Sequence, residues 1–308
     1  MKDTNIERMY EKIQFLKKEK NALVLAHFYQ IMDIQHIADF CGDSFELAKK
    51  ARSSEKQIIV FCGVRFMAES AKAMNPQKRI LLPRHDAGCP MADMVTPADV
   101  ARLRTAHPNA AVVCYINSSA ETKAVSDICC TSSNAIKVVR SLPQDEIIFI
   151  PDKNLGAYIA KQVPEKTFYL HQGWCPIHKN LQGSDAIAAK QANPGALLAV
   201  HPECEEDVLA VADFIGSTSE IIKFCHTTDA KKVIVGTELS VVERVSEECP
   251  EKEFLLLSPY LVCPNMKKTR VADLLHTLET LDGEIFMTEE EINAARLPLE
   301  RMLEAGKA

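Results

Sequence analysis

The stretches that decide the fold are LVLAHFY at residues 23–29, AVVCYIN at 111–117 and ALLAVHP at 196–202. Each is an apolar run of strand-forming residues that ends at polar side chains able to exchange protons or form hydrogen bonds. A small hydroxyl cluster follows each run and places Ser44, Ser132 and Thr218 at spacings of 88 and 86 residues. The chain therefore repeats one unit three times, with a period of about 87 residues.

Two further apolar runs follow the first in each unit, with helical segments between them. The second runs are IIVFC at 58–62, EIIFI at 146–150 and KVIVG at 232–236. The third runs are RILLP at 79–83, TFYLH at 167–171 and EFLLLS at 253–258. Strands joined by helices form right-handed crossovers and parallel sheets that are covered on both faces. The predicted fold class is α/β: three homologous three-layer α/β/α units with parallel sheets, arranged with pseudo-threefold symmetry around a central site.

The repeat also predicts the domain organisation. We expect the first unit at residues 1–103, the second at 104–190 and the third at 191–274, with 275–308 packing back on the first unit. An N-terminal helix at 4–19 is expected to stand outside the repeat. In the tail, Thr288 and Glu291 are spaced as a capping box before a helix that meets Pro298.

Composition limits the class of function. The chain has 308 residues, 47% of them hydrophobic and 25% charged, with a formal net charge of −6. The signs are interspersed, which argues against a nucleic-acid partner or a membrane surface. The amphipathic start is unlike a signal peptide and no stretch is long enough to span a membrane, so a cytoplasmic location is expected. In that reducing compartment the eleven cysteines are expected to be thiols or metal ligands rather than disulfides.

Only three cysteines recur at one position in all three units. Cys89, Cys175 and Cys263 each follow a third strand, each precedes a proline, and their spacings are 86 and 88 residues. Cys249 also precedes a proline, but it lies before a third strand, so the position in the repeat matters more than the dipeptide. Cysteines inside apolar runs, such as Cys114, are interpreted as buried core residues.

Three converging thiolates favour a [4Fe-4S] cluster. Structural zinc is nearly always four-coordinate, with ligands paired closely in sequence. A cluster held by three cysteines keeps one iron open to oxygen or nitrogen atoms of a substrate, on which it would act as a Lewis acid. The rival fourth ligand is His178, three residues after Cys175, which would complete a Cys₃His zinc site.

Other polar residues point to the same edge of the sheets, because ligands of parallel sheets bind at the carboxyl ends of the strands. The first strands end in His27 and Tyr29, Tyr115 and Asn117, and His201 and Glu203. We expect Ser44, Ser132 and Thr218 to cap helices and to bind anions there, while Ser217 and Glu220 are spaced as a capping box. This predicts a central site with acids, bases and anion-binding hydroxyls.

Several motifs resemble the quinolinate synthase family over essentially the whole chain. They are AHFYQ at 26–30, GDS at 42–44, YINS at 115–118, CTSSN at 130–134, PDKNLG at 151–156, GWCPIH at 173–178, HPEC at 201–204 and GSTS at 216–219. The resemblance implies an enzyme of NAD biosynthesis that condenses iminoaspartate (iminosuccinate) with dihydroxyacetone phosphate, releasing phosphate and water to give quinolinate.

The resemblance also implies roles for individual residues. Cys89, Cys175 and Cys263 would hold the cluster, and Tyr29, His178, His201 and Glu203 would carry the acid–base chemistry. The residues that would contact substrate are His27, Ser44, Tyr115, Asn117, Ser132, His201, Glu203, Ser217 and Thr218. Some relatives carry further cysteines just before the third ligand, and residues 258–262 contain none.

Partners and alternatives follow from this interpretation. The expected partners are the two small substrates, with functional coupling to an aspartate-oxidising enzyme that would supply iminoaspartate. The alternatives are a metal-containing metabolite-binding or redox-sensing protein without turnover, and a Cys₃His zinc enzyme. The density of acid and base candidates around the predicted axis favours the synthase.

Overall fold

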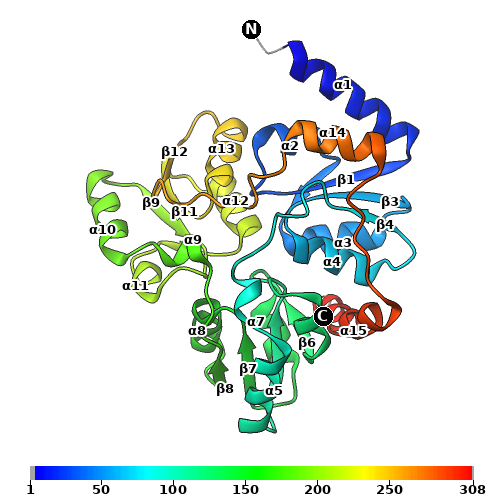
Figure 1. Cartoon of the computed structure of the whole chain (residues 1–308). Helices are drawn as coiled ribbons and strands as arrows, with labels where there is room; N and C mark the ends of the chain where they lie inside the picture. The colour runs from blue at the N-terminus through cyan, green and yellow to red at the C-terminus, as the bar shows by residue number, and fades with distance from the viewer. Residues whose placement is uncertain (1–3, 307–308) are drawn as a thin grey trace.

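The structure, a computed structural model, describes residues 4–306. Within that range twelve strands form three separate four-stranded sheets, and every strand pair in them is parallel. Figure 1 shows the three sheets with their helices grouped as a triangle. The predicted fold class is therefore confirmed.

The three units share one order of elements. The first has α1 (Thr4–Glu19), β1 (Ala22–His27), α2 (Met32–Ile37), β2 (Phe40–Gly42), α3 (Ser44–Ser53), β3 (Ile58–Cys62), α4 (Arg65–Met74), β4 (Arg79–Leu81) and the 3₁₀ turn η1 (Ala92–Met94). The second has α5 (Pro97–Ala106), β5 (Ala111–Tyr115), α6 (Ala120–Ala124), β6 (Ile128–Cys130), α7 (Ala135–Ser141), β7 (Glu146–Ile150), α8 (Lys153–Gln162), β8 (Thr167–Leu170) and α9 (Pro176–Lys179).

The third unit and the tail complete the chain. They comprise α10 (Gly183–Ala192), β9 (Leu197–Val200), α11 (Glu206–Leu209), β10 (Phe214–Ile215), α12 (Thr218–Thr227), β11 (Lys232–Gly236), α13 (Leu239–Glu248), β12 (Glu253–Leu256), α14 (Val271–Thr280) and α15 (Glu289–Ala305). The sheet orders are β2-β1-β3-β4, β6-β5-β7-β8 and β10-β9-β11-β12. One topology is thus used three times.

Both faces of each sheet are buried, which explains the apolar first strands. Along β1, Leu23 and Leu25 pack into one hydrophobic cluster, while Val24 and Ala26 pack into another on the opposite face. Successive side chains of a strand point to opposite faces, so a sheet covered on both sides needs an uninterrupted apolar run. The polar residue that ends each run therefore marks the edge of the core.

Each sheet also has a fourth strand that the sequence analysis missed. β2, β6 and β10 are two or three residues long and pair with the first strand of their sheet. They are too short to show a strand pattern of their own. They lead directly into the hydroxyl clusters, so they carry those hydroxyls to the carboxyl edge.

An aspartate before each short strand fixes the register. Asp39, Asp127 and Asp213, 88 and 86 residues apart, accept the backbone N–H of a first-strand residue through Oδ2, in each case at 2.7 Å. Each aspartate also pairs with a cation of the helix before the first strand of its unit, at 2.8, 3.0 and 2.7 Å from Lys17, Arg104 and Lys190. The cations are 87 and 86 residues apart and make the same contact in each unit, so α1, α5 and α10 occupy equivalent places.

The expectation that the N-terminal helix stands outside the repeat is therefore wrong. α1 occupies the place of α5 and α10, although its sequence pattern differs and it is longer than either. The predicted boundaries after residues 103 and 190 fall inside α5 and α10 and stay predictions. Residues 1–3 of the predicted first unit and residues 307–308 of the predicted tail lie outside the described range.

The tail runs back along the first sheet. Gly283 O accepts from Leu82 N and Ile285 N donates to Ile80 O, both at 2.8 Å, so the tail covers the edge strand β4. Gly283 has φ +89°, and a Cβ there would lie 2.6 Å from Leu82 O, so only glycine fits. Before this segment, α14 packs on α1, and after it, α15 packs on α4, α6 and β6. The predicted capping box of Thr288 and Glu291 is confirmed at the start of α15.

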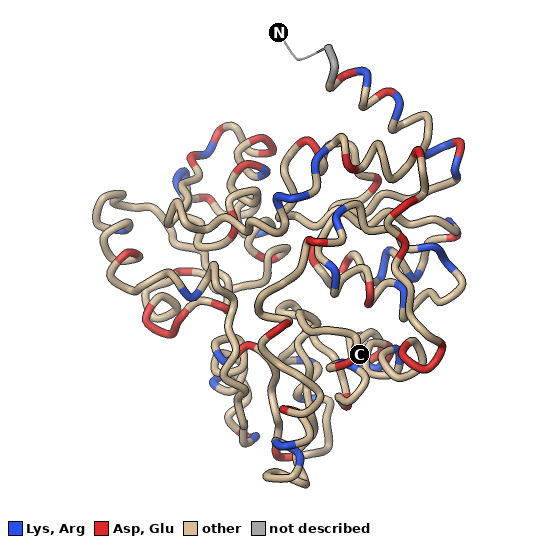
Figure 2. The backbone as a smooth tube through the Cα atoms, in the orientation of Figure 1, with Lys and Arg blue, Asp and Glu red and all other residues tan. Residues whose placement is uncertain are grey.

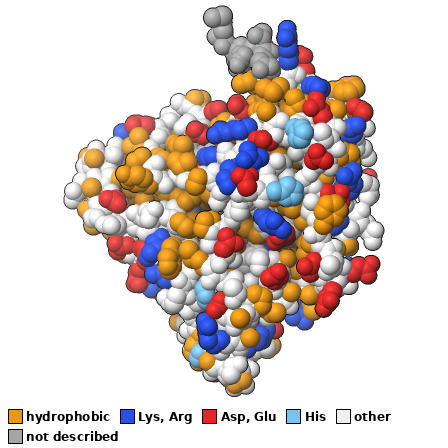
Figure 3. Space-filling view, in the orientation of Figure 1, with side chains coloured by type: hydrophobic (Ala, Val, Ile, Leu, Met, Phe, Trp, Pro, Cys, Tyr) orange, Lys and Arg blue, Asp and Glu red, His pale blue; other side chains and the backbone are white. Residues whose placement is uncertain are grey.

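Charges of both signs are spread over the helices and the connecting loops. Figure 2 shows Lys and Arg interspersed with Asp and Glu along the backbone, and Figure 3 shows the same mixture between apolar side chains on one face. No helix within residues 4–306 has the length and apolar character needed to cross a membrane.

The aspartate that fixes the third sheet yields a stability prediction. Asp213→Ala leaves the buried Leu198 N–H without its acceptor and should lower the free energy of unfolding by about 1 to 2 kcal/mol. Burial raises the pKa of Asp213, but Lys190 and Leu198 N outweigh burial and bring the pKa below its ordinary value. The charged form is therefore stabilised by folding, and this contribution is present above the ordinary aspartate pKa and lost as pH falls below it.

Urea denaturation between pH 7 and pH 3 checks this prediction. The difference in unfolding free energy between wild type and Asp213→Asn should shrink as pH falls. The exposed Asp229, changed to Asn, is the matched control and should show little difference at any pH. A wild-type and Asp213→Ala pair of equal stability at pH 7 would contradict the proposed register contact.

Candidate metal centre and active site

The three in-phase cysteines line one cavity of about 150 Å³ where the carboxyl ends of the three sheets meet. Cys89, Cys175 and Cys263 each lie in a loop after the last strand of their sheet. Burial raises the pKa of Cys89 to about 12, and nearby Cys263 and Glu203 add to the rise. Burial also raises the pKa of Cys175 and Cys263. Thiolates in this cavity therefore need a nearby cation or metal.

One backbone hydrogen bond fixes each cysteine loop. The first residue of the helix after β3, β7 or β11 donates its N–H to the carbonyl two residues before the cysteine. The bonds run from Arg65 to Ala87 at 2.8 Å, from Lys153 to Gly173 at 2.9 Å and from Leu239 to Leu261 at 2.8 Å. The three loops are thus held at equivalent places in the three sheets.

Two of the loops are also held by buried carboxylates. Asp152 Oδ2 accepts from Cys175 N, and Glu238 Oε1 accepts from Cys263 N, each at 3.1 Å. Both acids also accept backbone N–H groups at the start of their helices. Lys267 Nζ lies 2.9 Å from Glu238 Oε1 and compensates that buried charge. The first unit has Val64 at the equivalent position, so its cysteine lacks such a contact.

Backbone amides on the other side favour the thiolate form. Hydrogen bonding from Ala92 and Met91 opposes the rise in the pKa of Cys89, and that from Met266 and Asn265 does so for Cys263. His178 N acts in the same way on Cys175. These donors lie two or three residues after each cysteine, so all three loops present N–H groups to their sulfur atoms. Such hydrogen bonds are typical of iron–sulfur ligation.

The spacing of the donors tests which metal group would fit. A single zinc ion needs four ligand atoms at about 2.0–2.3 Å, which places them close together. Within residues 4–306, the one group of three candidate ligand atoms within 4.8 Å of one another is Cys175, His178 and Glu203. The three cysteine sulfurs do not form such a group, with or without His178. Three thiols that are more widely spaced around one cavity fit a multinuclear cluster better than one ion.

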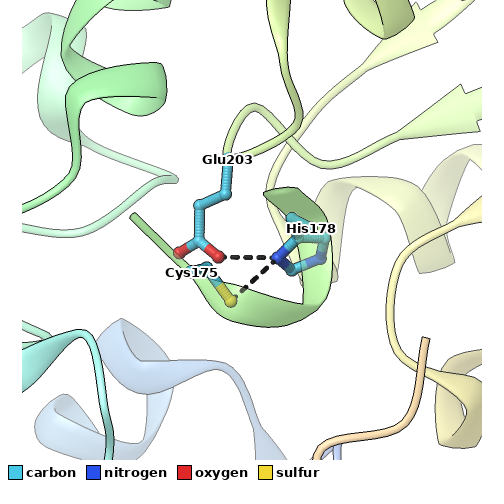
Figure 4. A group of neighbouring side chains, drawn as sticks. All are labelled: Cys175, His178 and Glu203. Carbon is cyan, nitrogen blue, oxygen red and sulfur yellow. Dashed lines mark hydrogen bonds and ion pairs between the residues drawn. The ribbon is translucent and has the colours of Figure 1, made fainter. Parts of the chain in front are cut away.

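Glu203 lies at the centre of a buried network (Figure 4). His178 Nδ1 is 2.8 Å from Glu203 Oε2 and 3.3 Å from Cys175 Sγ. Tyr115 OH donates to Glu203 Oε1 at 2.6 Å. Burial alone raises the pKa of Glu203, but His201, His178 and the Tyr115 hydroxyl outweigh it and hold the pKa below its ordinary value. Glu203 is therefore a carboxylate at neutral pH.

The two other histidines of the site are neutral at pH 7. Burial lowers the pKa of His27 to about 3 and that of His201 to about 4. His27 Nδ1 accepts from Tyr29 N at 3.1 Å and His201 Nδ1 accepts from Glu203 N at 3.3 Å, equivalent contacts in the first and third units. These contacts place the ring proton on Nε2. Each ring can then donate a hydrogen bond from Nε2.

The three hydroxyl residues line the cavity, but they do not cap helices, so that expectation is wrong. Asp43 and Ser217 are the N-caps of α3 and α12, and Ser44 and Thr218 are the first helical residues. Ser132 lies in the turn before α7, whose N-cap is Asn134. The side chains of Asp43 and Ser217 cap α3 and α12, and all three hydroxyl residues line the cavity.

Nearly all the predicted site residues come together. Those that line the cavity with the cysteines are His27, Tyr29, Ser44, Tyr115, Asn117, Ser132, His201, Glu203 and Thr218. His178 lies behind Glu203 and Cys175 rather than on the wall. Ser217 is fully buried and its hydroxyl accepts from Glu220 N, which confirms the predicted capping box, and its contact with substrate stays a prediction.

Sequence reasoning missed a polar residue next to this wall. Thr237 Oγ1 is 2.7 Å from Tyr29 OH and 3.1 Å from His178 Nε2. It directly follows β11, at the position that Gly63 and Pro151 occupy in the other units. The repeat contained the signal: a hydroxyl stands in one unit where the other two have no polar side chain.

Comparisons with known proteins find similar sequences over nearly the whole chain. Residues 11–304 match the family described as quinolinate synthetase A protein. A quinolinate synthase of Alkaliphilus metalliredigens is 50% identical over 304 residues, covering 99% of each chain. One from Caldicellulosiruptor saccharolyticus is 49% identical over 300 residues, covering 97% of this chain and 99% of the relative.

Proposed function

Because this chain belongs to the quinolinate synthetase A family of enzymes, we propose that its central cavity condenses iminoaspartate with dihydroxyacetone phosphate to give quinolinate, phosphate and water. The single observation that supports this most is the shared cavity of three cysteines, a buried carboxylate and three hydroxyls. Both substrates carry anionic groups, whereas the chain is acidic overall. Local donors must therefore attract them.

The proposed cofactor is a [4Fe-4S] cluster held by Cys89, Cys175 and Cys263. The donor set fits such a group, because thiolates suit iron–sulfur clusters and backbone N–H groups face each sulfur. When bound, a cluster with three cysteine ligands supplies an open iron that polarises oxygen or nitrogen atoms of a substrate.

The chain's own residues would bind the substrates and move protons. Ser44, Ser132 and Thr218 would donate to carboxylate or phosphate oxygens, two of them from the first turn of a helix, where the helix dipole favours an anion. Glu203, ionised at neutral pH, would accept a proton during enolisation. The Tyr29 hydroxyl and the neutral rings of His27 and His201 would donate hydrogen bonds or protons to the departing oxygens.

This activity also suggests a cellular setting. Iminoaspartate would come from an aspartate-oxidising enzyme coupled in function to this one, and both would work in the cytoplasm. Neutral imidazoles and a low-pKa carboxylate around one cavity favour turnover over simple metabolite binding, because they pair a base with donors.

The cluster proposal predicts a specific loss. Protein purified anaerobically should be brown, hold about four irons and four sulfides per chain, and form quinolinate from the two substrates. Serine in place of Cys89, Cys175 or Cys263 should abolish the colour and the activity, because each removes one of three ligands. Visible absorption, iron analysis and a quinolinate assay measure this.

Cys249→Ser is the matched control, since Cys249 also precedes a proline but lies outside the cavity. It should keep iron and activity. Full iron content after loss of any one of the three proposed ligands would overturn the assignment. A colourless wild-type protein that binds one zinc ion would favour the zinc enzyme instead.

The hydroxyl proposal predicts a loss of affinity. Alanine at Ser44, Ser132 or Thr218 removes a donor to a charged ligand, which should weaken quinolinate binding or raise the KM about 10- to 150-fold. The absorption spectrum of the cluster should not change. Calorimetric titration with quinolinate and steady-state kinetics measure the effect.

Thr288→Ala is the control, because Thr288 caps α15 and does not line the cavity. It should lower the free energy of unfolding by about 1 kcal/mol and leave the quinolinate affinity unchanged. If the three alanine variants only melt earlier, with wild-type affinity, their hydroxyls do not bind substrate.

A further inference from the structure

A chain of hydrogen bonds links Tyr29 to Glu203 through a residue outside the cavity wall. Thr218 Oγ1 donates to Tyr29 OH at 3.1 Å, and Tyr29 OH is 2.7 Å from Thr237 Oγ1. Thr237 Oγ1 is in turn 3.1 Å from Nε2 of His178, whose Nδ1 is 2.8 Å from Glu203 Oε2. This series of hydrogen bonds connects Tyr29, which follows β1 in the first unit, with Glu203, which follows β9 in the third.

The hydrogen-bond partners determine which group donates at each step of the series. Since Thr218 donates to Tyr29, the phenol proton points to Thr237, and the Thr237 proton points to His178 Nε2. His178 then carries its proton on Nδ1 and donates it to the Glu203 carboxylate. Thr237 stands between Tyr29 and His178 in this series, so loss of its hydroxyl would break the link to both residues.

Within residues 4–306, the hydroxyl of Thr237 has two hydrogen-bond partners, Tyr29 and His178. Its side chain is fully buried. Burial and Glu203 raise the pKa of Tyr29, and the hydroxyls of Thr218 and Thr237 oppose that rise. The hydroxyl of the partly buried Tyr29 lies between Thr218 and Thr237, so Thr237 helps to determine where that hydroxyl points.

The equivalent positions show that this is not a general need of the fold. Gly63 follows β3 and Pro151 follows β7, so in those units the position carries no side-chain donor or acceptor. The backbone turn after the strand forms with Gly, Pro or Thr. The threonine hydroxyl is therefore specific to the unit that carries Glu203.

We infer that Thr237 is a positioning residue that holds Tyr29 and the His178–Glu203 pair in one hydrogen-bonded unit, so that the donor and the acceptor of protons face the substrate together. The inference deepens the proposed synthase function and rests on it. Thr237 itself does not line the cavity, so it acts through Tyr29 and His178 rather than on the substrate.

The test compares Thr237→Val, which removes the hydroxyl but keeps the shape, with Thr237→Ser, which keeps the hydroxyl. In the cluster-containing enzyme the valine variant should lose kcat about 10- to 100-fold. Its KM should stay within about threefold of wild type, because no substrate contact is removed. The serine variant should recover most of kcat.

A second readout does not depend on turnover. In protein labelled with ¹³Cζ-tyrosine, the Tyr29 signal, assigned through Tyr29→Phe, should shift in Thr237→Val and return toward its wild-type position in Thr237→Ser. Thr269→Val is the matched control: Thr269 is also fully buried, and its hydroxyl has no hydrogen-bond partner within residues 4–306. It should change neither kcat nor the Tyr29 signal.

The outcomes separate the two proposals. A wild-type kcat in Thr237→Val, a serine variant as impaired as the valine variant, or an unmoved Tyr29 signal would overturn the role of Thr237. If wild-type protein makes no quinolinate, the proposed function fails, while the tyrosine signal still tests whether Thr237 orients Tyr29.

Discussion

Three parallel sheets can share one site only because the carboxyl ends of their strands face the same centre, and one backbone hydrogen bond per sheet fixes the cysteine loop there. That bond joins the helix after β3, β7 or β11 to the carbonyl two residues before Cys89, Cys175 or Cys263. It needs no particular side chain, so any residue except proline can serve as its donor. The positions of all three thiols therefore follow from the fold itself.

On this symmetric frame the chemistry is asymmetric. The acids Asp152 and Glu238 hold the second and third cysteine loops, but the first unit has Val64 in their place. Thr237 has no polar counterpart, and the third unit has the carboxylate Glu203 at the position that Tyr29 occupies after the first strand of the first unit. Repetition thus supplies the positions, and substitutions at single positions in one unit supply the buried carboxylate and the threonine hydroxyl.

The repeat arithmetic predicted the sheets, the cysteine trio and the strand-end residues because each depends on a periodic pattern of residue type. It could not predict β10, which is only two residues long and exists because it pairs with β9. It placed the N-terminal helix outside the repeat because the equivalence of α1 rests on one ion pair, Lys17 with Asp39, rather than on an apolar pattern. Which of two neighbouring hydroxyls caps a helix depends on backbone angles, and so Ser217 rather than Thr218 caps α12.

The central claim is that three cysteines hold a four-iron cluster with one iron open to the substrate. Mössbauer spectra of protein reconstituted with ⁵⁷Fe, recorded with and without quinolinate, test it most directly. The account predicts that one iron in about four changes its isomer shift when quinolinate binds, while the others stay as they were. Spectra that are identical with and without saturating quinolinate, together with loss of the cluster in His178→Ala, would show a fully ligated cluster and contradict the account.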